Sequence, residues 1–255
     1  RMTESQVSSR ALREQEAFNE GLQRDGYMEV FDHTCHLFLR RRDQLICDEL
    51  QYAQGKDVLE LGSLSWRVWV EGNDIRPANL HCINISQEEI DQGKESSRDT
   101  KVKPNFYLMD ANCLEFEDDS FDFVYGCAIL HHLDYGRALD EVCRVLKPGG
   151  RILFVEPLGI NPVGKLVRAI TPFARTVDEK PLMLAELAEL EKKFHTRHYY
   201  EELFSVPLGV ISGFLFDNAD NWLTRFAFNL DLSLNRAFPP LRYLFRHVLV
   251  IGTLK

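Results

Sequence analysis

Polar side chains recur where short apolar runs of this sequence end. Glu60, Asn84, Asp110 and Glu156 each lie at the end of such a run, and Cys127 closely follows another. If the runs are parallel strands of one sheet, these groups meet at its carboxyl edge, where open parallel sheets bind ligands. Carboxylates and amides there can bond the amino and hydroxyl groups of a nucleotide-like ligand. The position of these polar residues, each at the end of an apolar run, therefore predicts a ligand site at one edge of a sheet.

The loop expected to cradle this ligand lies in residues 57–66. A buried strand that ends in an acidic residue and a glycine is typical of nucleotide-binding loops, whose further glycines let the backbone approach the ligand. Leu64 and Trp66 stand where those glycines are expected, while Ser63 and Ser65 offer hydroxyl groups. We expect a reshaped loop that still binds, and in which Leu64 and Trp66 can become glycine without unfolding the protein.

Strands alternate with helices through the middle of the chain. Apolar runs predict strands at residues 58–61, 79–85, 106–109, 121–125 and 152–155. Amphipathic segments predict helices at residues 66–71, 87–96 and 135–146. Ser86 is placed to cap the second helix, and Pro148 with the following glycines ends the third. This alternation predicts a parallel sheet with right-handed crossovers.

The two flanks of this core have different patterns. Residues 3–52 have helical spacing, with one apolar face at Ala17, Phe18, Leu22 and Tyr27 and another at Leu37, Leu39, Leu45, Ile46 and Leu50. Residues 158–194 and 218–244 predict a largely helical cap over the carboxyl edge, with His195 and His198 on its surface and further strands at 206–216 and 246–255.

We therefore divide the chain into an N-terminal helical segment (1–54), a ligand-binding core (55–157) and a third part (158–255). The third part holds the cap and the last two strands of the sheet. The predicted fold class is α/β, a Rossmann-like, seven-stranded and mostly parallel sheet with helices on both faces.

Composition argues against several classes of protein. The formal charge of −9 over 255 residues disfavours a nucleic-acid partner. Apolar runs fall short of the roughly 20 residues that span a bilayer, so we expect a cytoplasmic protein that does not bind membranes. Six scattered cysteines without a C-x-x-C pair indicate reduced, mostly buried thiols. His33, Cys35 and His36 lack further spaced ligands, and no metal site is predicted.

Three linked motifs resemble those of the class I S-adenosylmethionine-dependent methyltransferases, in their small-molecule, type 11-like branch. The motifs span residues 110–122, 123–132 and 144–150, in the order and spacing of that family, and the resemblance covers about residues 55–160. It implies an enzyme that uses S-adenosyl-L-methionine, yields S-adenosyl-L-homocysteine and methylates a small molecule.

The resemblance also implies which residues hold the cofactor. Asp110 would take the adenine amino group, and Asn84 stands where the family has an acidic residue at the ribose. Cys127 would lie beside the methionine portion, with Tyr27 closing over it. The complete implied set is Tyr27, Glu60, Gly62, Ser63, Ser65, Asn84, Ile85, Asp110, Ala111, Asn112 and Cys127.

The predicted cap is aromatic and offers few bases, which favours a hydrophobic acceptor. The loop 62–66 joined to this cap resembles the teleocidin-type methyltransferases, in which the alkene of a prenyl chain on an indole alkaloid is methylated and the resulting cation can cyclise onto the indole. This resemblance implies natural-product biosynthesis of a terpenoid indole alkaloid. Trp66, Phe214 and Trp222 would then line the substrate pocket, where aromatic faces suit a cation.

Two alternatives stay open. An O- or N-methyltransferase would use His131 as its general base, because imidazole accepts a proton near neutral pH. A non-catalytic S-adenosylmethionine-binding protein would keep the site but fail to present the methyl group, through its altered loop. Independently of these, the predicted long N-terminal helix needs a surface to cover, which favours a homo-oligomer.

Overall fold

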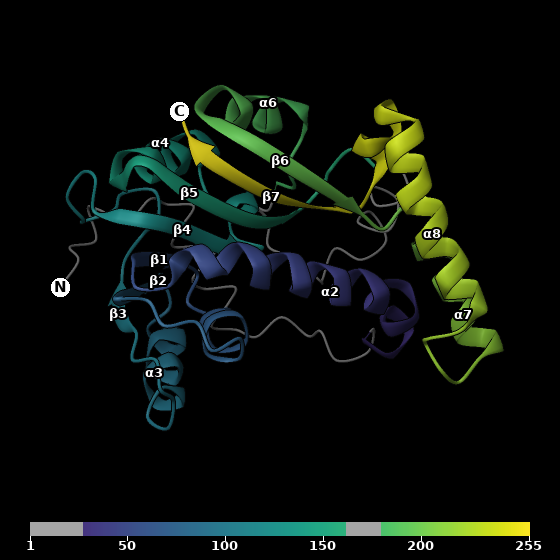
Figure 1. Ribbon diagram of the computed structural model, residues 1–255, viewed down its shortest axis with the longest axis horizontal. Helices are drawn as coiled ribbons and strands as arrows, with labels where there is room; N and C mark the ends of the chain where they lie inside the picture. Colours follow the sequence, from purple (N-terminus) through teal and green to yellow (C-terminus); the bar gives the residue numbers. More distant parts are fainter. Residues whose placement is uncertain (1–27, 162–179) are drawn as a thin grey trace.

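The computed structural model describes residues 28–161 and 180–255, and its centre is a seven-stranded sheet in the order β3-β2-β1-β4-β5-β7-β6 (Figure 1). The strands are β1 (Asp57–Leu61), β2 (Asn79–Asn84), β3 (Asn105–Leu108), β4 (Phe121–Cys127), β5 (Leu146–Pro157), β6 (Phe194–Glu201) and β7 (His247–Leu254). The first five pair in parallel, and β7 runs antiparallel to both of its neighbours, β5 and β6. The predicted fold class is confirmed.

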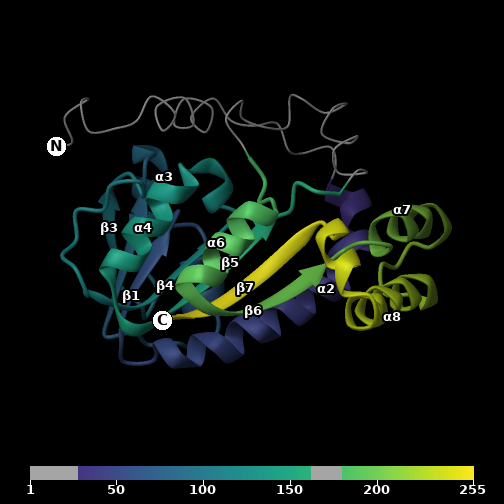
Figure 2. The same cartoon turned by 90° about the horizontal axis from the view of Figure 1, so that it is seen from above.

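Helices cover both faces of this sheet (Figure 2). Those over the sheet are α2 (Met28–Leu50), α3 (Gln87–Ser96), α4 (Tyr135–Val145) and α6 (Leu184–Lys193). Helices α7 (Ser205–Leu215) and α8 (Trp222–Ala237) pack against each other and against α2 at one end of the molecule. The short turns are η1 (Gln51–Ala53), η2 (Arg67–Glu71), η3 (Leu130–His132) and η5 (Pro239–Leu244). Leu139 and Val142 of α4 bury themselves in a core on one face, together with Leu190 of α6. Ile46 and Leu50 of α2 belong to a second core on the other face. Each such side chain contributes roughly 1.5–3 kcal/mol by its burial.

Capping residues set where the crossover helices begin. Ser86 accepts the Glu89 backbone N–H at 3.4 Å, as predicted for the helix at 87–96. Asp134 does the same for α4 by accepting the Arg137 N–H at 3.5 Å. These caps direct the chain away from the carboxyl edge of the sheet, so that edge is formed by loops.

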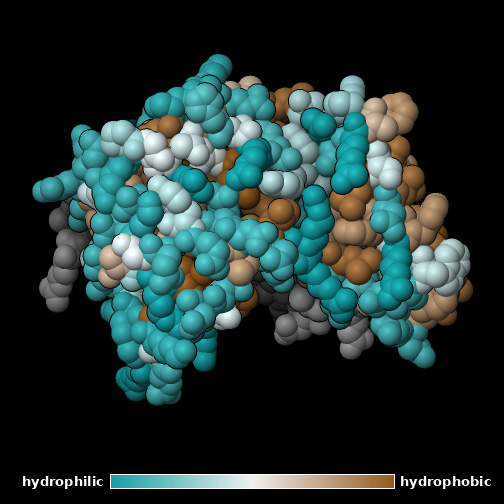
Figure 3. Space-filling model, viewed as in Figure 1, coloured by the Kyte–Doolittle hydropathy of each residue, from teal (hydrophilic) through white to brown (hydrophobic). Residues whose placement is uncertain are grey.

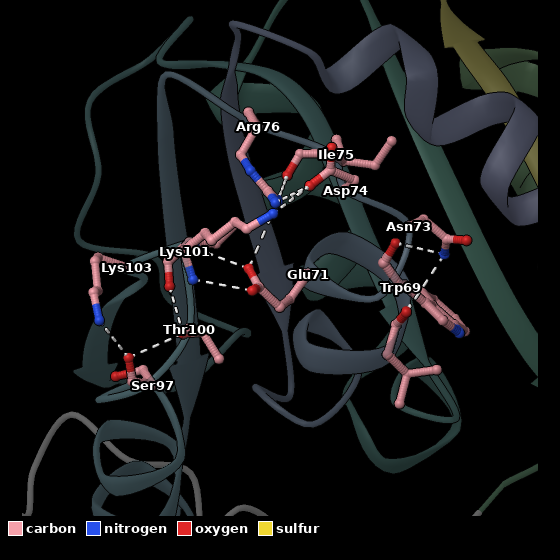
Figure 4. Close-up of polar contacts among 12 residues, drawn as sticks. Trp69, Glu71, Asn73, Asp74, Ile75, Arg76, Ser97, Thr100, Lys101 and Lys103 are labelled. Atoms are coloured by element: carbon pink, nitrogen blue, oxygen red, sulfur yellow. Dashed lines mark hydrogen bonds and ion pairs between the residues drawn. The ribbon is translucent and has the colours of Figure 1, made fainter.

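A polar cluster fixes the far end of η2 (Figure 4). The Glu71 carboxylate accepts the backbone N–H groups of Lys101 at 3.0 Å and Val102 at 2.9 Å, and Arg76 lies 3.6 Å from it. The turn η2, which follows the loop 62–66, is thereby tied to the segment that leads into β3.

The part of the chain after β5 departs from the sequence prediction. Residues 206–216 form a helix, α7, and the strand predicted there is wrong. A short continuous apolar run does not distinguish a strand from a helix by its periodicity. Strand β6 was predicted as cap, but its polar sequence suits an edge strand, whose charged side chains block further pairing. His195 and His198 therefore lie on the sheet instead of on a cap.

Candidate active site

The carboxyl ends of β1, β2 and β3 lie side by side, which brings residues distant in sequence to one edge. The Gly62 N–H donates to the Ile83 carbonyl at 2.9 Å, and the Met109 N–H donates to the Asn84 carbonyl at 2.9 Å. Leu61 of β1 also pairs with Gly126 of β4. This edge, from Gly62 through Asn84 and Asp110 to Cys127, is called the cofactor edge below.

Glu60 lies behind the loop and holds it in place. Its carboxylate accepts the backbone N–H groups of Ser65 at 2.6 Å and Trp66 at 3.1 Å, and the Tyr125 hydroxyl at 2.9 Å. The side chain is 1% exposed, and this burial raises the pKa of Glu60 to about 7. Its predicted contact with a cofactor is therefore corrected to a positioning role, because the carboxylate is covered by the loop it anchors.

The two bulky residues of the loop point in opposite directions. Trp66 is 2% exposed and packs edge-on against Phe106, with ring centroids 6.0 Å apart. Leu64 is 60% exposed. The prediction that Trp66 lines a substrate pocket is thus wrong, since Glu60 pulls its backbone inward and the indole fills the core. Replacing Trp66 by glycine would empty that space, so an intact fold stays a prediction for Leu64→Gly and is no longer expected for Trp66→Gly.

Asn84 joins the loop after β1 to the loop after β2. Its amide nitrogen donates to the Gly62 carbonyl at 2.7 Å and the Ser63 hydroxyl at 3.1 Å. Its amide oxygen accepts the Ser86 backbone N–H at 3.0 Å. Positive φ angles at Gly62 (102°) and Ser63 (54°) shape the turn that these bonds stabilise. Ile85 lies between the bonded residues, at the edge where the sequence placed the ribose.

Asp110 follows β3, and only one of its two carboxylate oxygens accepts hydrogen bonds from described residues. Oδ1 accepts both the backbone and the side-chain N–H of Asn112, each at 2.8 Å. No residue in the described ranges donates to Oδ2. Asn112 is fixed in turn, because its amide oxygen accepts the Asp134 N–H at 2.9 Å. Ala111, between them, is 5% exposed and packs in the core.

Cys127 lies at the carboxyl end of β4 and is exposed. Partial burial of the thiol by neighbouring protein atoms, together with the Glu156 carboxylate, raises its pKa to about 11. Ser65 of the loop is hydrogen-bonded to Cys127. Of the six cysteines only Cys82 is buried, so the prediction of mostly buried thiols is wrong.

A histidine and a carboxylate form a buried pair near Cys127. His131 Nδ1 lies 2.7 Å from a carboxylate oxygen of Glu156, and the two side chains are 6% and 0% exposed. Glu156 also accepts the backbone N–H groups of Ile129 at 3.0 Å and Leu130 at 2.8 Å. The pair resembles the orienting half of general-base sites, in which a carboxylate sets the tautomer of a histidine.

Comparisons with known proteins match this edge to one family. Residues 59–154 match a family model described as "Methyltransferase domain". A dimethylglycine N-methyltransferase of Parasynechococcus marenigrum is 34% identical over 141 residues, which cover 52% of this chain and 46% of the relative. Methyltransferase GfsG of Streptomyces halstedii is 27% identical over 122 residues, 46% of this chain and 43% of the relative. The matched part spans less than half the length of these relatives.

Residues 59–154 thus match a methyltransferase domain, and the fold that contains them is that of the class I S-adenosylmethionine-dependent methyltransferases. Its fold is similar to a geranyl diphosphate C-methyltransferase of Streptomyces coelicolor, solved with S-adenosyl-L-homocysteine, at a TM-score of 0.60 and 16% identity over 86% of this chain and 80% of that one. A putative sarcosine dimethylglycine methyltransferase of Galdieria sulphuraria has a TM-score of 0.55 at 17% identity, over 84% of this chain and 85% of that one.

The residues of the methyltransferase domain fit its cofactor at the cofactor edge. Asp110 Oδ2 can accept a hydrogen bond from an amino group, and the exposed, uncharged Cys127 lies at the same edge of the sheet. The turn at Gly62 and Ser63 has positive φ angles, and Ser63 and Ser65 provide hydroxyl groups beside the positions Leu64 and Trp66, where the family's further glycines are expected. Tyr27 lies outside the described residues, as does the predicted apolar face at Ala17, Phe18 and Leu22.

The aromatic residues predicted to form the acceptor pocket lie elsewhere in the methyltransferase structure. Phe214 is 83% exposed on α7, where it lines a hollow with His33 and Asp217. Trp222 is 66% exposed on α8 and packs edge-on against Phe216. Among the contacts of the described residues neither reaches the cofactor edge, and their place in a substrate pocket stays a prediction.

Sequence reasoning missed two partners that organise the methyltransferase site. Tyr125 was assigned only to a strand, although a polar-tipped residue inside an apolar run is a signal for a buried hydrogen bond. Glu156 was recognised at a strand end but not as the partner of His131. Across residues 28–161 and 180–255 no cluster of three or more potential metal ligands occurs, and His33 instead bonds Ser212 at 3.0 Å. In the same ranges, no helix has the length and apolar character to cross a membrane.

Proposed function

We propose that this chain is an S-adenosylmethionine-dependent methyltransferase that acts on a hydrophobic small molecule of natural-product biosynthesis. The observation that carries this proposal is the cofactor edge. There Asp110, the loop that Asn84 bonds at Gly62, and Cys127 lie at adjacent strand ends of one sheet. The matched methyltransferase relatives support it.

Each part of the edge has a distinct task in this proposal. Asp110 would bind the adenine amino group, Asn84 and Ile85 would lie at the ribose, and Ser63 and Ser65 would lie at the methionine portion. Glu60 acts through the backbone it holds. When bound, S-adenosylmethionine supplies a methyl group activated for in-line displacement. The protein contributes alignment and exclusion of water, which account for much of the catalysis of such a step.

For the acceptor we propose the prenyl chain of an indole alkaloid, methylated at carbon. Methylation of its alkene leaves a carbocation on the acceptor, which can close onto the indole. The ring then loses a proton to regain aromaticity. In this proposal His131 accepts that proton, and the Glu156 carboxylate, 2.7 Å from Nδ1, stabilises the resulting imidazolium. A fold shared with a methyltransferase that acts on geranyl diphosphate is consistent with a prenyl acceptor.

The same pair favours a second candidate, an O- or N-methyltransferase in which His131 removes a proton from the acceptor. His131→Ala separates the two candidates. For a carbon acceptor, methyl transfer continues and the ratio of products changes, because the base acts after the methyl group has moved. For an oxygen or nitrogen acceptor that must lose its proton first, turnover falls about 10²- to 10⁴-fold. Calorimetry with S-adenosylhomocysteine shows whether the cofactor edge is intact in the variant.

Cofactor binding itself is tested with Asp110→Ala. We expect S-adenosylhomocysteine to bind about tenfold to hundredfold more weakly, because a bond to a charged acceptor is lost. Asp91→Ala, which removes an exposed carboxylate of α3, serves as the matched control and should bind normally. Absence of binding to the wild-type chain would contradict the proposal. Tight binding without methyl transfer to any acceptor would instead favour the non-catalytic binding protein.

A further inference from the structure

Helix α7 is oriented with its small and polar residues inward. Ser205, Gly209 and Ser212 are its buried residues. Ile211, Phe214 and Leu215 are 48%, 83% and 65% exposed. A surface helix normally buries its apolar stripe and exposes its polar one, and here the arrangement is reversed.

Specific contacts fix α7 in this orientation. A Cβ atom at Gly209 would lie 2.5 Å from Thr34 Cα, so only glycine lets α7 approach the backbone of α2 this closely. Ser212 Oγ bonds His33 Nδ1 at 3.0 Å and accepts a bond from Asn221 at 2.7 Å. Rotation of α7 to bury its apolar side would break these bonds and separate the helices.

A buried carboxylate fixes the first turn of α7 as well. Asp231 of α8 is fully buried and accepts the backbone N–H groups of Leu203, Phe204 and Ser205 at 2.9, 2.7 and 3.0 Å. These donors lie just before and at the start of α7, where a helix has no internal partners for its N–H groups. The outward direction of the apolar side is therefore built into the fold.

Helix α8 extends this apolar surface. Trp222 and Phe226 are 66% and 55% exposed at the end of α8 that adjoins α7. Hydrophobic side chains gather over α7 and α8 in the space-filling view (Figure 3). We call the residues Ile211, Phe214, Leu215, Trp222 and Phe226 the outer apolar face.

The size of the outer apolar face suits the centre of a protein interface. At roughly 150–250 Å² for each aromatic side chain, its three rings offer about 300–500 Å² of accessible surface, to which the two aliphatic residues add. A standard interface buries about 800 Å² per partner, with an apolar, aromatic-rich centre and a polar rim. The outer apolar face matches that centre.

Charges around this face favour a second copy over a lipid surface. Arg225 pairs with Asp220 at 2.7 Å, and Arg40 lies 3.4 Å from the same carboxylate, so these two cations share one carboxylate within the chain. Asp217 adds an exposed negative charge next to α7. With a net charge of −9, the chain would be repelled by anionic headgroups. The outer apolar face itself carries no charged residue, and the positive and negative side chains around it balance. Two identical faces of this kind can therefore meet without net charge repulsion.

We propose that the outer apolar face pairs with the same face of a second copy of this chain. Such an isologous contact places each Phe214 and Trp222 against the partner's copy of the face, as two-fold symmetry requires. The proposal is independent of the methyl acceptor and of the cofactor edge.

Sedimentation velocity over about a hundredfold range of protein concentration tests this pairing. We expect a dimer for the wild-type chain, and association at least about tenfold weaker for Phe214→Ser with Leu215→Ser and for Trp222→Ser. Leu184→Ser, which removes an exposed apolar residue of α6 outside the face, is the matched control and should leave the dimer intact. Circular dichroism establishes that the variants remain folded, as expected for exposed positions.

Three results would overturn the proposal. The wild-type chain stays monomeric at every concentration, or its assembly resists both variants of the face. In the third, a wild-type chain that is monomeric in solution floats with vesicles of phosphatidylcholine, which would identify a lipid surface as the occupant.

Discussion

The cofactor edge and the α7–α8 pair use a similar anchor with opposite results. At the cofactor edge, buried Glu60 accepts two backbone N–H groups and turns the large side chain of Trp66 into the core. In the α7–α8 pair, buried Asp231 accepts three N–H groups and sets α7 with its large side chains outward. In both regions the buried carboxylate fixes the backbone, and the backbone then decides which side chains remain available to a partner.

Trp66 provides the strongest test of this comparison. Trp66→Gly should lower the free energy of unfolding by about 3–5 kcal/mol, because it empties a core position. Leu64→Gly should change stability by less than about 1 kcal/mol, since its side chain is already in solvent. Urea unfolding of both variants measures the difference. If both substitutions lowered the free energy of unfolding equally, the buried position of Trp66 and the exposed position of Leu64 would be contradicted.

A third buried carboxylate, Glu202 after β6, is held by cations instead of N–H groups. Burial alone would raise its pKa, but His247, Arg246 and Arg42 outweigh that effect and lower the pKa from 4.5 to about 2. Glu202 therefore stabilises the fold above pH 4.5, and this contribution is lost as the pH falls towards 2. The loss should amount to up to about 3 kcal/mol.

Unfolding free energies measured across this acid range check the prediction for Glu202. In Glu202→Gln the slope of stability against pH should be flatter between pH 4.5 and 2. Glu60 should show the opposite sign. Its pKa of about 7 in the folded protein lies above the ordinary value of 4.5, so it lowers the stability of the fold as the pH rises from 4.5 to about 7. A slope that Glu202→Gln leaves unchanged would contradict the assignment.

Asp231→Ala should cost about 2–3 kcal/mol, because buried N–H groups before α7 lose their acceptor. It should also weaken the proposed dimer, since the outer apolar face depends on the orientation of α7. Thermal unfolding and sedimentation measure the two effects. If Asp231→Ala were destabilised but formed the dimer as well as the wild type, the outer apolar face would not depend on Asp231.

The smallest effect is expected at the anchor of the cofactor edge. Glu60→Gln keeps one oxygen acceptor and the size of the side chain, so the loop should persist with a loosened hold on Ser65 or Trp66. We expect S-adenosylhomocysteine to bind about tenfold more weakly, or about 1.4 kcal/mol. Calorimetry on Glu60→Gln, with Tyr125→Phe as the milder companion, measures this change. Undiminished binding by Glu60→Gln would mean that the loop needs no anchor.

Much of the sheet and the cofactor edge could be predicted from the sequence, because both follow from local patterns. Apolar runs located β1 to β5, and the phase of their polar ends located Asp110 and Cys127. The direction of Trp66 could not be predicted, since it depends on the hydrogen bonds that the backbone N–H groups of Ser65 and Trp66 donate to Glu60. The helix at α7 was predicted as a strand because its apolar run is short. Its true orientation depends on Gly209 and Asp231, which act through contacts distant in sequence.

The backbone bonds beside His131 show how two distant stretches of the chain meet. Gly159 N–H donates to the Leu182 carbonyl, Leu182 N–H to the Pro157 carbonyl, and Lys180 N–H to the His131 carbonyl, each at 2.9 Å. These three bonds join residues 157–159 and His131 directly to residues 180–182. A substitution at Lys180 or Leu182 that displaces this backbone would therefore also displace the proposed base, His131.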